Sequence, residues 1–160
     1  MAKPGLVRRL AGSTTVRASI VASIVVFAAA TLPFVQGLSY PFLHDDRWAV
    51  VGNPVVDGTI DPARILASNA WGNASTHLHI PNYRPLSVLT LAATRAWTGL
   101  APRPFRATNV LLHGFCSVLM LLLVRRLRIG PIPAALTGVW FALHPVHVEA
   151  RRAELTEHGR

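Results

Sequence analysis

The chain has 160 residues, of which 51% are hydrophobic and only 14% are charged. Soluble domains carry roughly 25% charged residues, so this composition indicates a membrane protein. The formal net charge is +9, but the basic residues are scattered and cluster only beside apolar runs, which argues against nucleic-acid binding. The single cysteine, Cys116, excludes a disulfide framework within the chain.

The N-terminal part of the chain predicts a basic cytoplasmic segment and then a transmembrane helix. Residues 1–17 carry four basic side chains and no acid, whereas residues 18–38 carry no charge. A helix of this length spans a hydrocarbon core of roughly 30 Å. We expect Pro33 to kink its outer end, and the basic flank predicts a cytoplasmic N-terminus. A cleaved signal peptide is the alternative, although the apolar run is longer than a usual signal core.

Residues 39–104 are predicted to form an external loop that contains two helices on the membrane surface. Asp61, followed by a proline, is typical of a helix N-cap and predicts a short helix at about 62–70. The apolar stretch 85–100 is interrupted by Arg95 and is short for a span. We expect it to lie in the interface, with its arginine extended to the lipid headgroups.

The C-terminal part of the chain predicts two further spans. Residues 105–124 form a second apolar run, and the arginine-rich turn 125–133 marks its cytoplasmic end. A third span is predicted at 134–150, although its apolar part is short for a bilayer. An atypical charged tail follows at 151–160. The fold class is therefore an all-α, multi-pass protein of the cell membrane with about three transmembrane helices.

Two groups of ionisable residues are predicted at the external membrane face. They follow the first and third spans and consist of Asp45, Asp46, His144, His147 and Glu149. Ionisable groups at membrane depth are costly and therefore usually have a partner or a function. Such side chains can hold a divalent cation, orient a phosphate-linked donor or act as a general base. Acids in an exposed loop and histidines hydrogen-bonded at a helix end are the alternatives without chemistry.

Two further segments place polar residues near the predicted membrane surface. Arg84 precedes the second interfacial helix, and its guanidinium can pair with the phosphate of a lipid-linked donor through two parallel hydrogen bonds. An ordinary interface anchor is the alternative. Asn109 and His113 lie one helical turn apart at the start of the second span, where a helix-packing contact is the more common role.

Five segments in this order resemble the start of the TMTC-type proteins, which are membrane proteins with a GT-C-type glycosyltransferase core followed by tetratricopeptide repeats. The segments are Phe42-Leu-His-Asp45-Asp46, Asn53-Pro-Val-Val56, Asn82-Tyr-Arg-Pro-Leu86, Asn109-Val-Leu-Leu-His113 and Phe141-Ala-Leu-His144-Pro-Val-His147-Val-Glu149-Ala150. The resemblance implies a sugar transferase, specific for mannose in animal members, that uses a polyprenyl-phosphate donor and Ser or Thr hydroxyls of a protein acceptor.

The resemblance also implies roles for the residues of the two polar groups. An acid in the first external loop of GT-C enzymes is the catalytic base or a metal-binding acid, which here implies Asp45 or Asp46, with Glu149 as a second acid. These acids are also the expected ligands of a divalent cation, if the reaction needs one. Arg84, His144 and His147 are then expected at the donor.

The charged tail departs from the family pattern, because members continue after the His-Pro-x-His-x-Glu-Ala segment through further spans. We therefore expect a truncated N-terminal fragment that is inactive alone, since three spans cannot build the donor cavity. A small non-enzymatic membrane subunit or scaffold is the alternative from a different class. A secreted basic protein is a third interpretation.

Overall fold

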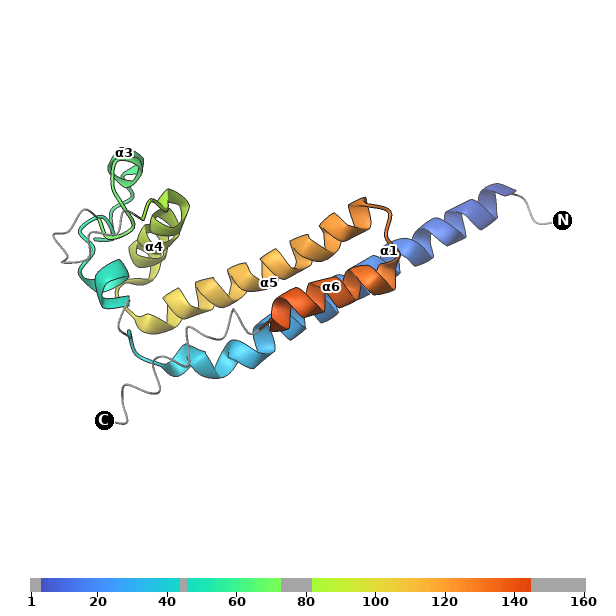
Figure 1. The fold of residues 1–160 in the computed structure, drawn as a ribbon, viewed down its shortest axis with the longest axis horizontal. Coiled ribbons are helices and arrows are strands. Elements are labelled where there is room, and N and C mark those ends of the chain that lie inside the picture. Colours follow the sequence, from blue (N-terminus) through green and yellow to red (C-terminus); the bar gives the residue numbers. More distant parts are fainter. Residues whose placement is uncertain (1–3, 44–45, 73–81, 145–160) are drawn as a thin grey trace. The chain divides into compact units, whose positions relative to one another are not determined.

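In the computed structural model, residues 4–43, 46–72 and 82–144 are described, and all regular structure within these ranges is helical (Figure 1). The elements are the α-helices α1 (Pro4–Thr31), α3 (Pro62–Leu66), α4 (Pro85–Thr98), α5 (Pro102–Arg126) and α6 (Pro131–Leu143), the 3-10 helix η1 (Leu32–Ser39) and the π-helix η2 (Arg47–Val51). The chain divides into two compact units. We call them the bundle unit, formed by α1, α6 and the part of α5 after Asn109, and the loop unit, residues 36–109.

Two helical stretches among the described residues are long and apolar enough to cross a membrane. They are Val16–Ser39, with 24 residues, and Pro102–Arg126, with 25. Helix α6 is apolar but has only 13 residues, which gives a length of about 20 Å. The third predicted span, 134–150, is therefore not seen as one helix, since α6 ends at Leu143 and residues 145–150 lie outside the described ranges.

The first candidate span changes its helix type near the proline. The α-helical hydrogen bonds of α1 end at Thr31, and the 3-10 helix η1 begins one residue before Pro33. Proline has no amide hydrogen and cannot donate to the carbonyl four residues earlier. The structure therefore shows a change from α to 3-10 geometry beside Pro33, whereas the expected kink stays a prediction.

Small residues allow the helices of the bundle unit to approach closely. Figure 1 shows α6 lying along α1, and these two helices are in contact. A Cβ on Gly138 of α6 would lie 3.1 Å from the Val26 side chain of α1. On α5, a Cβ on Gly114 would lie only 2.6 Å from the ring of Phe27. Small residues at such crossings are typical of membrane helix packing.

His113 contributes a polar contact to the same bundle. Its Nε2 lies 3.0 Å from the carbonyl oxygen of Ala142 on α6, and its ring packs edge-on against Phe34. The expected packing role of this histidine is confirmed. Asn109, its predicted partner one turn earlier, is exposed and lies at the boundary of the loop unit.

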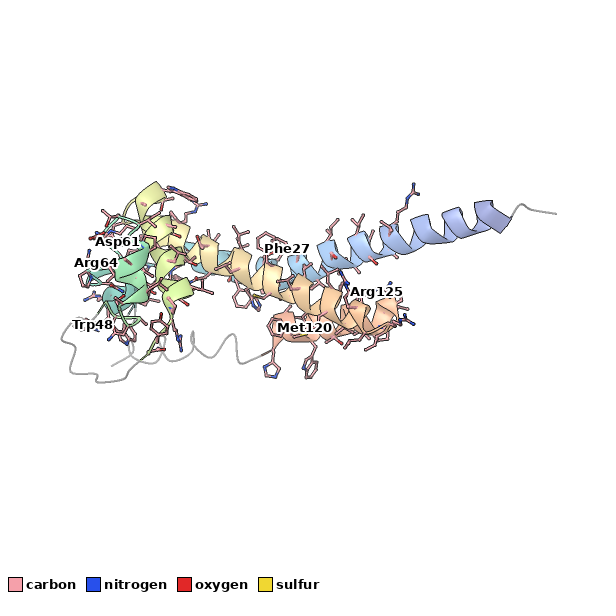
Figure 2. All side chains as sticks on the ribbon, turned by 90° about the horizontal axis from the view of Figure 1, so that it is seen from above. Phe27, Trp48, Asp61, Arg64, Met120 and Arg125 are labelled. Atoms are coloured by element: carbon pink, nitrogen blue, oxygen red, sulfur yellow. The ribbon has the colours of Figure 1, made fainter. Side chains whose placement is uncertain are left out.

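The loop unit has its own hydrophobic core, built by residues from η2, the turn that follows it, α3, α4 and the start of α5. The buried members are Val50, Val55, Val56, Ile65, Val88, Ala92 and Phe105. Asp61 caps α3, because its Oδ1 accepts hydrogen bonds from the amides of Ala63 and Arg64 at 3.0 and 3.2 Å. The predicted N-cap is confirmed, although α3 ends at Leu66 rather than near residue 70. Figure 2 shows Asp61 and Arg64 together on this short helix.

Candidate functional site

Asp46 is the member of the predicted acidic pair that the structure describes, and it lies just before η2 in the loop unit. Its Oδ2 accepts a hydrogen bond from the Leu43 amide at 3.1 Å and forms an ion pair with Arg106 Nη2 at 3.3 Å. The Asp46 side chain is 39% exposed, so the carboxylate remains reachable from outside. Asp46 follows Asp45 in the sequence, and among the described residues no hydrogen bond or ion pair involves its Oδ1.

Arg106 joins the segment around Asp46 to the first turns of α5. Besides the ion pair, its Nε donates to the Tyr40 carbonyl at 3.0 Å, and its Nη2 donates to the Pro41 carbonyl. The Arg106 side chain is only 22% exposed, and the planar set of donors of its guanidinium suits several acceptors at once. We name this arrangement the Arg106 clamp, comprising Arg106, Asp46 and the carbonyls of residues 40 and 41. Sequence reasoning did not single out Arg106, because its partners lie about sixty residues away.

The other predicted site residues divide into those outside the described ranges and those at exposed positions. Asp45, His147 and Glu149 lie outside, so their placement stays a prediction. Arg84 is exposed at the N-cap position of α4 but makes no side-chain cap. His144 is exposed at the C-cap of α6, where its ring contacts Trp140 edge-on. The predicted meeting of the two polar groups at one face therefore stays a prediction as well.

Asn53 is a buried residue that joins backbone segments of the loop unit. In the sequence it stood out only as part of a motif. Its side chain is 2% exposed, and its Nδ2 donates to the carbonyls of Ala49 and Ala70 at 3.2 and 3.0 Å. Its Oδ1 accepts from the Val55 amide at 3.0 Å. Three backbone segments are thus held by one amide, which satisfies polar groups that would be costly to bury unpaired.

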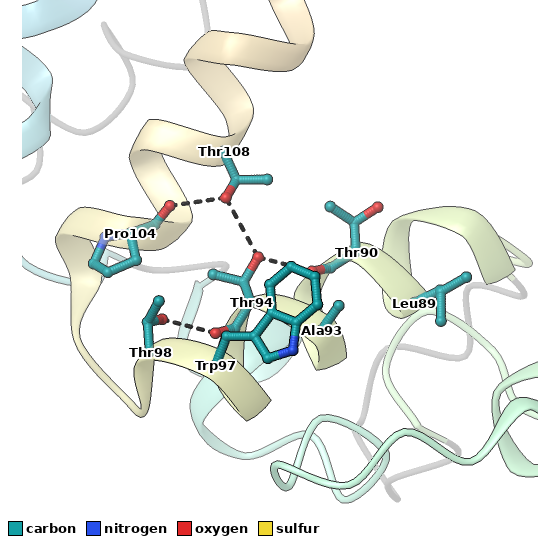
Figure 3. A pocket seen from close by; sticks show the side chains of 8 residues that line it. All are labelled: Leu89, Thr90, Ala93, Thr94, Trp97, Thr98, Pro104 and Thr108. Atoms are coloured by element: carbon teal, nitrogen blue, oxygen red, sulfur yellow. Dashed lines mark hydrogen bonds between the residues drawn. The ribbon is translucent and has the colours of Figure 1, made fainter.

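The loop unit also has a pocket of about 370 Å³ between α4 and the first turns of α5 (Figure 3). Threonines at every fourth position of α4 line it together with Thr108, and Trp97 stands beside them. Each hydroxyl donates to the carbonyl four residues earlier, for example Thr94 to Thr90 at 2.8 Å. The hydroxyls of Thr94 and Thr108 also lie 3.3 Å apart, and either can donate to the other (Figure 3). None of the described residues that line this pocket carries a charge.

No three His, Cys, Asp or Glu side chains gather into a metal site within the described ranges. Asp46 is the described member of the expected ligand set, and a single carboxylate does not hold a divalent cation tightly. A cation site would need Asp45 and Glu149, which lie outside those ranges. The divalent cation accordingly stays a prediction.

Several known protein O-mannosyl-transferases are similar to this chain. Protein O-mannosyl-transferase TMTC1 of Mus musculus is 38% identical over 133 residues, which cover 81% of this chain and 14% of that protein. Tmtc1 of Drosophila melanogaster is 31% identical over 127 residues, which cover 77% and 14%. TMTC4 of Homo sapiens is 31% identical over 143 residues, which cover 80% and 19%.

This chain is related to the TMTC protein O-mannosyl-transferases. The predicted relationship to the TMTC-type proteins is thereby confirmed. The chain spans only about 14–19% of the length of the relatives named above. No family model matches the chain, and no solved structure matches it.

Proposed function

We propose that this chain is the part of a TMTC-like membrane glycosyltransferase that carries the first external loop of a GT-C-type core, with Asp45 and Asp46. The observation that carries the proposal is similarity over about four-fifths of the chain to proteins named O-mannosyl-transferases. The reaction would move a mannose-like sugar from a polyprenyl-phosphate donor to a Ser or Thr hydroxyl of a protein acceptor. Residues 1–160 alone should show no transfer, because so few spans enclose too little volume for a lipid-linked sugar.

Asp46 is the described residue best suited to act in this reaction. The Arg106 clamp occupies its Oδ2 and fixes its orientation, so proton acceptance from the hydroxyl, or a bond to a cation, would fall on Oδ1. Positioning a catalytic group in advance lowers the entropy cost of reaching the reactive geometry. Asp45 and Glu149 are the proposed additional acids, and Arg84, His144 and His147 the proposed donor contacts.

The proposed topology is a multi-pass membrane protein with a cytoplasmic N-terminus. It places α1 and α5 across the bilayer, α6 at the start of a third span, and the loop unit outside. Helix α4 would lie on the outer surface, because only residues 99–101 connect its end to the outer end of the α5 span. Its Trp97 and Leu86 side chains are 84% and 77% exposed, which is typical of residues at a lipid interface.

A chimeric enzyme tests the catalytic assignment. The matching segment of mouse TMTC1 is replaced by the corresponding residues of this chain, and mannose transfer is measured in isolated membranes. We expect Asp46→Asn to lower the rate at least about 100-fold, which is the contribution of a positioned general base. Asp61→Asn is the matched control, because asparagine caps a helix about as well as aspartate. A rate for the Asp46→Asn chimera equal to that of the control would exclude Asp46 from the chemistry.

A non-enzymatic membrane subunit is the second candidate, and the Arg106 clamp itself favours it. In that case the Asp46–Arg106 pair only closes the loop unit. A partly exposed ion pair contributes about 1 kcal/mol or less, so Asp46→Asn should then lower thermal stability only slightly. Arg106→Gln should lower it more, because it also removes the hydrogen bonds to the carbonyls of Tyr40 and Pro41. Loss of transfer by Asp46→Asn in a chimera with unchanged melting temperature would instead support the enzyme.

A further inference from the structure

The described part of the bundle unit contains a set of four arginines that lie near one another in the fold, and no acidic residue. Arg125, Arg126 and Arg128 end α5 and begin the turn to α6, and Arg17 lies on α1. The Arg125 guanidinium donates to the Ile129 carbonyl, whereas the side chains of the other three are exposed.

Helix packing brings these arginines to one end of the bundle unit. Val26 of α1, Gly138 of α6 and Leu121 of α5 meet at one level, and α5 runs opposite to α1 (Figure 1). Arg17 precedes Val26 by nine residues, or about 13 Å, and Arg125 follows Leu121 by four residues, or about 6 Å, in the same direction. Figure 2 shows Arg125 near the end of α5. We call Arg17, Arg125, Arg126 and Arg128 the arginine cluster.

Exposed apolar side chains begin directly beside the arginine cluster. They cover all three helices and are Ile20, Val21 and Ile24 on α1, Leu123 on α5, and Ile132 and Leu136 on α6. Such a surface is unfavourable in water and matches a bilayer core. The charges therefore lie where that apolar surface ends, at the depth of lipid headgroups.

The backbone at Arg128 is a second, independent observation. Its φ is +61°, and among the described residues no other non-glycine residue has a positive φ. Glycine would adopt this conformation without the steric cost that a side chain brings. An arginine with this backbone conformation is a reason to test whether its side chain has a role.

We propose that the arginine cluster binds the phosphates of anionic phospholipids in the leaflet at this end of the bundle. Charge complementarity carries the assignment, since the guanidiniums have no carboxylate in the described unit and a phosphate accepts two of their N–H groups in parallel. The anionic leaflet of a membrane attracts basic residues close to its surface. The inference rests on the proposed membrane insertion.

Lipid enrichment around the full chain tests this site. The chain is reconstituted in vesicles of phosphatidylcholine and phosphatidylglycerol, purified in mild detergent, and the retained lipids are quantified by mass spectrometry. We expect phosphatidylglycerol to be enriched, and Arg128→Asn to lower the enrichment about fivefold per charge removed. Asparagine tolerates a positive φ, so the turn should be kept. The double variant with Arg126→Gln should lose most of the enrichment.

Arg103→Gln is the matched control, because it removes one charge from the first turn of α5, which belongs to the loop unit and not to the arginine cluster. Unchanged enrichment in the control supports a site, whereas an equal loss in the control shows an effect of net charge and overturns the proposal. Unchanged enrichment in the double variant overturns it as well. Resistance to carbonate extraction checks insertion separately, and a chain that is extracted contradicts both the membrane topology and this site.

Discussion

Gly72→Ala should open the loop unit, and its cost can be worked out from the contacts of one side chain. Gly72 has a φ of +67°, which costs an alanine about 1–2 kcal/mol. The new Cβ would lie 2.2 Å from Asn53 Oδ1 and 2.8 Å from the Pro54 ring. The amide of Asn53 must therefore move and break its three hydrogen bonds, at about 1 kcal/mol each. The total is about 4–5 kcal/mol.

A double-mutant cycle separates the backbone strain from the clash. In an Asn53→Ala background the clashing oxygen is absent, so Gly72→Ala should cost about 2–3 kcal/mol less than it does in the wild type. Gly58→Ala is a control for strain alone, because its φ is +105° and a Cβ there meets nothing within 4 Å.

Trypsin cleavage within the loop unit measures these costs, since the rate follows the population of the open form. A difference of 3 kcal/mol corresponds to a change in that population on the order of 100-fold. Additive effects of the two substitutions would refute the reasoning, because they would mean that Asn53 does not meet the new methyl group. Equal cleavage of Gly58→Ala and Gly72→Ala would refute it too.

Two further predictions concern the bundle unit and the acid side of the pH range. Gly114→Leu should separate α1 from α5, at a cost of about 1–3 kcal/mol from overpacking against Phe27, and thermal unfolding in detergent measures it. An unchanged melting temperature would show that the helices do not cross there. The pKa of Asp57 is lowered from 3.8 to about 2, first by the Thr59 hydroxyl, then by the Thr59 amide, and less by Arg64. The stability contributed by this carboxylate is therefore complete above about pH 4 and is lost as the pH falls towards 2. Carbon-13 titration should show a larger rise in the pKa of Asp57 for Thr59→Val than for Arg64→Gln, and the reverse order would contradict the assigned cause.

Local chemistry was readable from the sequence, whereas contacts between distant residues were not. The Asp61 cap follows from two adjacent residues, because an acid before a proline satisfies the first free amides of a helix wherever the helix packs. The Arg106 clamp joins positions about sixty residues apart, and nothing in the residues around Arg106 specifies its partners. The close approach at Gly114 likewise depends on which face of α1 meets α5.

The candidate site shows the same division. Asp46 was predicted as a site residue because a carboxylate at membrane depth costs free energy unless it has a partner or a function. Its orientation depends on Arg106, and its proposed companions Asp45, His147 and Glu149 lie outside the described ranges. The structural role of Asn53 could not be predicted from the sequence, where the residue was only part of a motif. Its role depends on the three backbone groups that its side chain bonds, and these come together only in the folded loop unit.

The Arg106 clamp sets an order of events during biosynthesis. Asp46 leaves the ribosome sixty residues before Arg106, a delay of roughly 3–12 s at ordinary elongation rates. Until then Asp46 and the carbonyls of Tyr40 and Pro41 lack the guanidinium that holds them, so a chaperone or a modifying enzyme can still reach the segment. The Arg106 clamp can therefore form only after the first turns of α5 have been translated, although its other members lie in a segment made about sixty residues earlier.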